Sequence, residues 1–240
     1  VEVMEPVENL ISAFLAPRSA RFDEICGVKC PMRRIVYDCR LINQAIKKST
    51  SPLLTNDEVN NRLSGARRIT LIDLSHCYES IKVSKEFAKY SNFIIADRTF
   101  RINALIQGLS ISGFAACSVI SKILDGLDLG EDHQLLKFMD DVTLISRTND
   151  RFAHLEALAK VLRRLNEYDA SISSNKLVVG VSHATLLGRS VACSRKMVHR
   201  FISEKHRSNI MLLKPPKTSD DAVSFLSSAQ FYSRYVPFHA

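Results

Sequence analysis

The sequence lacks any apolar run that approaches the roughly 18 residues needed to span a membrane, so we expect no membrane among its partners. Close pairs of cysteines are also missing, because only Cys26 and Cys30 of the six cysteines lie near each other. We therefore expect neither a disulfide nor a zinc site. Internal repeats and low-complexity segments are absent, and a hydrophobic content of 46% over 240 residues is normal for a packed core. The chain does not begin with methionine, which indicates a fragment or a processed piece of a longer polypeptide.

Acidic residues are fewer than basic ones, 25 against 33, which gives a formal net charge of +8 and a pI near 9.3. Much of the excess lies in one segment with a single acid, Glu204, whose eight basic residues are Arg189, Arg195, Lys196, Arg200, Lys205, Arg207, Lys214 and Lys217. Such a segment favours an anionic partner, and a surface that follows the phosphates of a nucleic acid is the sharper interpretation. A solvated helix face is the alternative.

Two adjacent carboxylates, Asp140 and Asp141, interrupt a stretch with the composition of a buried strand, Lys137–Ile145. Burying an ionised carboxylate is costly unless a partner or a metal offsets the cost, and neighbouring carboxylates also repel each other. A third carboxylate, Asp73, interrupts the strand-like run Ile69–Leu74 in the same way. Two strands can therefore present three carboxylates at one point, and such oxygen ligands suit Mg²⁺ or Mn²⁺. Enzymes use a pair of such ions to catalyse nucleotidyl transfer. The alternative is that these acidic residues lie in turns exposed to solvent.

The spacing of apolar residues predicts strands and helices in alternation. The expected extended segments are Met32–Asn43 with a turn at its end, Ala66–Leu74, Asn92–Ala96 paired with Thr99–Leu105, the hairpin Leu135–Ser146, Lys176–Val181 and Ala184–Val191. The expected helices are a short one at Pro6–Leu15, one that ends near Ser64 after the loop Lys47–Asn61, a mixture of helix and turn at Tyr78–Tyr90, the later part of Leu109–Leu129, Asp150–Asp169, and a capped helix that begins near Thr218 or Ser219. This order gives an α+β fold in which helices cover one face of a sheet.

Six sequence elements in order resemble the reverse transcriptases of gypsy-type LTR retrotransposons and retroviruses. The elements are Arg34, Val36, Asp38, Arg40 and Asn43 of an R-x-V-x-D-x-R-x-x-N pattern; Asp73, Leu74 and Tyr78; Gln107 and Gly108; Phe138 to Asp141, similar to a Tyr-x-Asp-Asp box; Asn175 and Lys176 with Leu187 and Gly188; and a tail from Pro215 to Ala240. A single Asp-Asp box is weak evidence, whereas six ordered elements with family-like gaps are specific.

The resemblance implies a right-hand polymerase with fingers, a palm whose antiparallel sheet is backed by helices, and the start of a thumb. Residues 1–66 would form the first part of the fingers and residues 67–190 the palm, with residues 82–104 returning to the fingers. Residues 191–240 would form the thumb and the start of the connection. The chain would be one part of a pol polyprotein, with protease, RNase H and integrase outside it, located in a cytoplasmic particle or the nucleus.

The resemblance also implies a function for particular residues. Asp73, Asp140 and Asp141 would hold two Mg²⁺ or Mn²⁺ ions for the addition of dNTPs to a primer on an RNA or DNA template. The expected dNTP-binding residues are Arg34, Leu74, Tyr78, Gln107, Gly108 and Met139, with Tyr78 as the gate against a ribose 2′-hydroxyl. Lys176 would donate a proton to the pyrophosphate, Leu187 and Gly188 would form the primer grip, and the basic segment would contact the template–primer backbone.

The sequence departs from the family pattern at positions that are not metal ligands. Phe138 replaces the usual tyrosine, Ile106 stands where proline is common, and Glu79-Ser80-Ile81 replaces His-Gln-Ile. Two other functions stay open: an RNA-dependent RNA polymerase, against which Tyr78 argues, and a degenerate palm that binds nucleic acid without catalysis.

Overall fold

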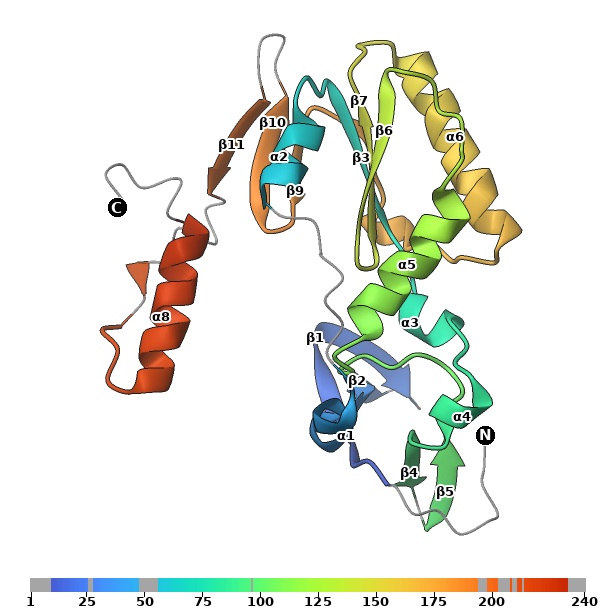
Figure 1. Ribbon diagram of the computed structural model, residues 1–240, viewed down its shortest axis with the longest axis vertical. Coiled ribbons are helices and arrows are strands. Elements are labelled where there is room, and N and C mark those ends of the chain that lie inside the picture. Colours follow the sequence, from blue (N-terminus) through green and yellow to red (C-terminus); the bar gives the residue numbers. More distant parts are fainter. Residues whose placement is uncertain are drawn as a thin grey trace.

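A four-stranded antiparallel sheet, with strand order β6-β7-β3-β8, forms the centre of the protein (Figure 1). Its strands are β3 (Arg68–Asp73), β6 (His133–Phe138), β7 (Asp141–Ser146) and β8 (Val178–Val181). This computed structural model describes residues 10–25, 28–47, 56–95, 97–193, 198–202, 208, 211–212 and 214–232.

Two helices, α5 (Ser112–Leu124) and α6 (Arg151–Glu167), cover one face of this sheet. Side chains alternate between the faces of a strand, so Ile72, Val142 and Leu144 point toward these helices and are almost fully buried. Helix α6 begins where Asp150 accepts hydrogen bonds from the first backbone amides of the helix. The apolar period seen in the sequence thus corresponds to the face that packs on the sheet.

The other face of the sheet is covered by α2 (Asn56–Leu63) and by a second sheet of three strands. The second sheet contains β9 (His183–Leu186), β10 (Arg189–Cys193) and β11 (Val198–Ile202). A second core joins Val59 and Leu63 of α2 to Ile69, Leu136 and Ile145 of the central sheet. Helices were expected on one face of the sheet only, and this was wrong, because α2 packs on the other face through Val59 and Leu63.

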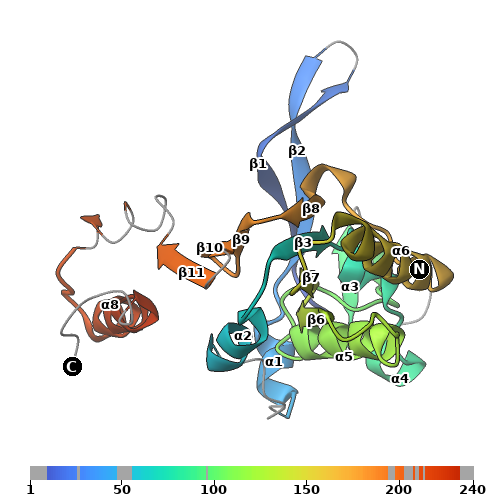
Figure 2. The ribbon, with the colours of Figure 1, turned by 90° about the horizontal axis from the view of Figure 1, so that it is seen from above.

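The fingers region has a third apolar core, which includes Ile11, Cys39, Phe93, Ile106 and Leu109. Its elements are β1 (Ala13–Ile25), β2 (Val28–Tyr37), α1 (Arg40–Ala45), α4 (Lys85–Ala88), β4 (Asn92–Ile95) and β5 (Arg98–Arg101), and α3 (Cys77–Ser80) leads into it from the palm. Strands β1 and β2 form an antiparallel ribbon that projects from the molecule (Figure 2). The core thus joins residues from the start of the chain to the 82–104 segment.

Helix α8 (Ser219–Tyr232) lies apart from the palm, beyond β11 (Figures 1 and 2). Thr218 and Asp221 cap its start reciprocally, since the Asp221 amide donates to Thr218 Oγ1 and the Thr218 amide donates to Asp221 Oδ2. The predicted start of this helix is confirmed. Among the described residues, no helix has the length and apolar character of a membrane span.

Most predicted elements are found, but four expectations were wrong. Helix α2 begins at Asn56, inside the segment Lys47–Asn61 that was expected to be a loop. The helix predicted at Pro6–Leu15 does not form in its described part, because Ala13 already begins β1, whose cross-strand pairing with β2 outweighs local helix preference. The turn expected after the Met32 strand is the short helix α1. The single strand expected at Ala184–Val191 is the hairpin β9–β10, and β11 was not foreseen. Residues 1–9 and Cys26 lie outside the described residues.

Candidate active site

The register of the central sheet sets two carboxylates directly opposite each other. Asp73, the last residue of β3, pairs with Asp141, the first residue of β7. Opposed residues in an antiparallel pair have Cβ atoms about 4.5–5.5 Å apart and point to the same face, so their like charges repel. Asp140 precedes Asp141 in the turn. Negative charge is therefore concentrated at this end of the two strands, and a bound cation would reduce the repulsion.

A tight turn holds Asp140 in place. Only Met139 and Asp140 lie between Phe138 and Asp141, which pair across the hairpin. Met139 has a φ of 55°, a left-handed conformation that is unusual for a residue other than glycine. Its side chain lies against Gly113 of α5, where an added Cβ would meet Met139 Cε at 3.6 Å. The packing of this turn against α5 thus supports a strained backbone beside the carboxylates.

Lys176 places a positive charge beside these carboxylates. It ends the 3₁₀ helix η1 (Ser174–Lys176), and its Nζ lies 2.7 Å from Asp73 Oδ1. The chain reaches this position because the Ser173 amide donates to the Asp73 carbonyl at 2.9 Å and Leu74 forms a β-bridge with Ile172. A lysine that follows Asp73 by 103 residues therefore meets it directly.

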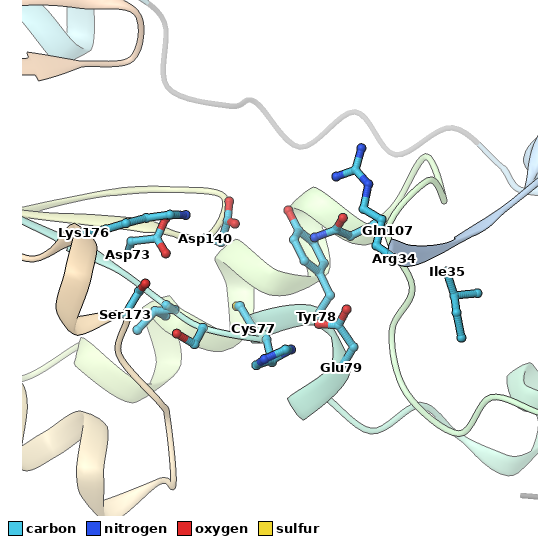
Figure 3. Close-up of a pocket in the computed structure, with 13 residues that line it drawn as sticks. Arg34, Ile35, Asp73, Cys77, Tyr78, Glu79, Gln107, Asp140, Ser173 and Lys176 are labelled. Atoms are coloured by element: carbon cyan, nitrogen blue, oxygen red, sulfur yellow. The ribbon is translucent and has the colours of Figure 1, made fainter. Parts of the chain in front are cut away.

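A cleft of about 460 Å³ opens in front of the carboxylates, as Figure 3 shows. Lys176, Asp73 and Ser173 lie along one side of it, Asp140 lies near its centre, and Arg34 and Gln107 lie across from them. Tyr78 stands between the two sides. Its side chain is 9% exposed, and burial together with the charge of Asp140 raises its pKa to about 12, so it remains a neutral phenol. The walls thus combine carboxylates, cations and one aromatic ring.

A neighbouring cavity of about 420 Å³ continues from Tyr78 and Asp140 along Gln107, Gly108 and Met139. Asn43 of α1 fixes this loop, since its Nδ2 donates to the Gly108 carbonyl and its Oδ1 accepts from the Ser110 amide, both at 2.8 Å. Gly108 has a φ of +108°, and a Cβ there would meet the side chain of Cys39. A glycine is therefore required where the fingers meet the palm.

On the other side of the carboxylates, the turn between β9 and β10 approaches the sheet. Its two residues, Leu187 and Gly188, have φ values of 48° and 76°, which is the geometry of a type I′ hairpin turn. Leu187, Asp73, Asp141 and Lys176 line a hollow of about 180 Å³. Asp73 and Lys176 belong to both this hollow and the larger cleft.

The chemistry of the donor set fits a hard divalent cation, although the carboxylates do not form a closed cage. Within the described part of the chain, no three Asp, Glu, His or Cys side chains are close enough to form a ready metal centre. Partial burial and the charges of Asp140 and Asp73 raise the pKa of Asp141, whereas Lys176 lowers it. Carboxylate oxygens are the ligands that Mg²⁺ and Mn²⁺ prefer, and a cation here would relieve the repulsion.

The structure brings most of the predicted site residues together. Arg34, Asp73, Leu74, Tyr78, Gln107, Asp140 and Lys176 line one cleft, and Gly108, Met139, Asp141 and Leu187 line the two adjoining hollows. Gly188 lines none of these three spaces. It is the second residue of the turn between β9 and β10. Ile35, His76, Glu79 and Ser173 also line the cleft, although the sequence interpretation gave them no role. The proximity of His76 and Glu79 to Tyr78 in sequence was the available signal.

The basic segment is only partly described. Arg189 is buried, with 8% of its surface exposed, because it lies in β10 between β9 and β11. It was wrongly included in a solvent-facing basic surface. Lys214 and Lys217 are exposed, whereas Arg195, Lys196, Lys205 and Arg207, and the side chain of Arg200, lie outside the described residues.

In this protein, two helices back an antiparallel sheet, acidic residues lie at the end of two of its strands, and a separate fingers core adjoins the sheet. This combination defines a polymerase palm. Residues 29–207 match the family model described as reverse transcriptase (RNA-dependent DNA polymerase). Because this match covers more than half of the chain, the protein belongs to the reverse transcriptase family of nucleotidyltransferases. This family depends on divalent metal ions.

Sequence relatives include polyproteins of a transposon and of a virus. The chain is 23% identical over 203 residues to the retrovirus-related Pol polyprotein from transposon 412 of Drosophila melanogaster, a match that covers 85% of this chain and 16% of the polyprotein. It is 20% identical over 236 residues to polyprotein P3 of Commelina yellow mottle virus, covering 97% of this chain and 12% of that protein. The chain thus spans less than a fifth of the length of these relatives.

Solved structures with the same fold include foamy viral protease-reverse transcriptases. One, in complex with double-stranded DNA, superposes with a TM-score of 0.79 at 18% identity and covers 100% of this chain and 38% of that chain. Another, in complex with an RNA/DNA hybrid, has a TM-score of 0.73 at 18% identity and covers 97% of this chain and 29% of that chain. The right-hand polymerase fold predicted from the sequence is confirmed.

Proposed function

We propose that this chain is an active RNA-directed DNA polymerase, which adds dNTPs to the 3′-hydroxyl of a primer on an RNA or DNA template. The observation that carries the proposal is the pairing of Asp73 with Asp141, beside Asp140, at the edge of a cleft that also contains Arg34 and Tyr78. The chain would work within a pol polyprotein, with protease, RNase H and integrase in other parts. The relatives named above are polyproteins, one of them a retrovirus-related Pol polyprotein.

Asp73, Asp140 and Asp141 would hold two Mg²⁺ or Mn²⁺ ions. When bound, the ions supply activation of the attacking hydroxyl and neutralisation of the leaving pyrophosphate. The pairing of β3 with β7 then keeps Asp73 and Asp141 in register. Lys176 assists by pairing its ammonium group with this site, since its Nζ lies 2.7 Å from Asp73 Oδ1.

Arg34 is proposed to bind the triphosphate, since its guanidinium lies across the cleft from the carboxylates and can form paired hydrogen bonds with phosphate oxygens. Gln107 and Gly108 would contact the base and sugar, with Leu74 and Met139 completing the walls. Tyr78 fills the space between the carboxylates and Gln107 and would exclude a ribose 2′-hydroxyl.

Lys176 would donate a proton to the departing pyrophosphate, because it lines the cleft and 55% of its side chain is exposed. Leu187 and Gly188 would hold the end of the primer, since Leu187 shares a hollow with Asp73 and Asp141. The primer and the triphosphate would thus approach the carboxylates from opposite sides.

We also propose the division into fingers (1–66), palm (67–190, with 82–104 in the fingers) and thumb (191–240), with α2 of the first segment packed on the palm sheet. The division after residue 190 falls within β10, so the sheet formed by β9, β10 and β11 joins the palm to the thumb.

Extension of a DNA primer on an RNA template, with dNTPs and Mg²⁺ or Mn²⁺, tests the proposal. The parent chain should extend the primer, and Asp140→Asn should reduce the rate by about 10³-fold or more, because a carboxylate that holds the reacting groups cannot be replaced by a neutral amide. Asp132→Asn, which removes an exposed carboxylate elsewhere in the chain, should extend normally. If parent and Asp140→Asn both bind the duplex and neither extends, the chain is a binding module and the proposal is wrong.

A further inference from the structure

A second cavity, of about 410 Å³, adjoins the segment Leu74–Cys77 and has an apolar lining. One wall is formed by Val119, Ile120 and Ile123 of α5, and Ile81 after α3 and Ala170 after α6 complete it. The volume lies within the range of small-molecule sites, which are concave and mainly apolar with a few polar groups. This cavity takes no part in the polymerase mechanism described above.

The walls of the cavity expose apolar surface that the core leaves uncovered. Ile81, Ile123 and Ala170 pack against the main core but are only half-buried, and Tyr168 at the margin is 58% exposed. An apolar or aromatic body placed here would remove this surface from water. The shape and lining therefore favour a ligand with a compact apolar part.

Two lysines give the cavity its charge preference. Lys82 and Lys122 both line it and are both exposed, and neither has an ion-pair partner among the residues that the structure describes. No acidic side chain lines the cavity. The hydroxyls of Ser75, Ser80 and Ser171 add further polar groups. An apolar ligand with an anionic group matches both parts of the lining.

The cavity shares a wall with the active-site cleft. Leu74, Ser75 and Cys77 line both spaces, and they form the segment that joins Asp73 to Tyr78. The Ser75 amide donates to the Ser171 carbonyl at 2.8 Å, which ties this segment to the chain that leads on to Lys176. A ligand that displaces the shared wall must therefore move residues next to the carboxylates and the tyrosine.

We propose that this cavity binds a small amphipathic anion, such as an aromatic sulfonate or carboxylate, and that its occupation slows nucleotide addition through the shared wall. The apolar body lies between α3 and α5, and the anionic group lies at Lys82 and Lys122. The effect on synthesis rests on the proposed polymerase function, whereas the binding site does not.

Fluorescence titration with anilinonaphthalene sulfonate tests the binding site without any catalysis. The parent chain should bind one probe molecule in a saturable way, and template–primer duplex or dNTP should not displace it. The double variant Lys82→Glu/Lys122→Glu should bind about tenfold more weakly, because two attractions become repulsions. Val119→Phe, which fills the cavity, should weaken binding as well. The matched control Lys85→Glu/Lys89→Glu reverses two exposed charges on or beside α4 and should bind like the parent.

Equal binding by the parent and the double variant would place the probe elsewhere and overturn the site. Displacement of the probe by dNTP would show that the probe binds in the polymerase cleft, and this result would also overturn the proposed site. Because these readouts are independent of synthesis, they decide the site even if the chain proves inactive.

Primer extension in the presence of the probe tests the coupling. Saturating probe should lower kcat by about fivefold or more with little change in the KM for dNTP, and it should not affect Lys82→Glu/Lys122→Glu in the same concentration range. If the parent extends normally while the probe is bound, the coupling is wrong. If the parent does not extend in the absence of probe, the proposed polymerase function fails instead.

Discussion

At the scale of single residues, the opposed pair of Asp73 and Asp141 is a feature that a stable fold would not select. Like charges directly across a sheet destabilise it, and the raised pKa of Asp141 reports the same cost. We predict that Asp141→Asn increases the free energy of unfolding by about 0.2–1 kcal/mol in metal-free buffer, and abolishes extension. Urea denaturation measures the first effect, with Asp132→Asn as the neutral control. A less stable Asp141→Asn would show that the carboxylate is held by favourable contacts.

Tyr78 acts at the same scale through its volume. Its ring fills the space between Asp140 and Gln107, and its hydroxyl stays protonated because its pKa is raised to about 12. Tyr78→Ala should therefore reduce the preference for dNTP over rNTP by about tenfold or more, since the obstacle to the 2′-hydroxyl is removed. Tyr78→Phe keeps the ring and should keep the preference. Single-nucleotide insertion kinetics give the ratio for each variant, and an unchanged ratio for Tyr78→Ala would remove the proposed gate.

At the scale of elements, one buried histidine joins α6 to three strands. His154 is 1% exposed; its Nε2 lies 2.7 Å from Thr70 Oγ1 of β3 and its Nδ1 lies 2.5 Å from Ser146 Oγ of β7. Thr70 Oγ1 also accepts a hydrogen bond from the Gly180 amide of β8. Burial, together with the positive charges of His133 and Arg68, lowers the pKa of His154 from 6.5 to about 4. The network therefore holds the neutral imidazole.

This shift predicts an acid-sensitive fold. The unfolded chain binds a proton near pH 6.5 and the folded chain only near pH 4, so the stability is complete above pH 6.5 and is lost as the pH falls toward 4. At pH 5 the loss due to this group should be about 2 kcal/mol. Urea denaturation at pH 7.5 and at pH 5 gives the loss of stability for each protein, and this loss should be larger for the parent than for His154→Gln. His76→Gln, which removes an exposed histidine, is the control and should behave like the parent. Parallel pH profiles for the parent and His154→Gln would contradict the prediction.

At the scale of the whole molecule, a basic chain of net charge +8 presents its carboxylates in a cleft between two separate cores. The proposed binding of template–primer would then depend on phosphate contacts away from these carboxylates. We predict that the logarithm of the binding constant falls linearly with the logarithm of the salt concentration, with a slope of about −0.9 for each phosphate contacted. Fluorescence anisotropy of a labelled duplex measures the slope. Asp140→Asn should give the same slope, and binding insensitive to salt would contradict a phosphate-tracking surface.

Most elements of the palm could be predicted because their signals are local. The alternation in Arg68–Asp73 and in the β6–β7 hairpin, and the helical period of α6, each repeat within a few residues. The error at Ala13–Leu15 arose where the chain's preference is weak and pairing with β2 decides the conformation. Leu187 and Gly188 were singled out as the primer grip, but a single strand was drawn through them because a left-handed φ at leucine has no local sequence signal.

The sequence by itself determined the order of the residues proposed to carry the chemistry, because the spacing of Asp73, Tyr78, Gln107 and Asp140 is a property of the chain. Only the tertiary structure decided which of them meet. Sheet register placed Asp73 opposite Asp141, the return of the chain after α6 brought Lys176 to Asp73, and the packing of β10 buried Arg189. Such contacts join residues far apart in sequence, and their geometry follows from how strands and helices close around shared cores rather than from any local pattern.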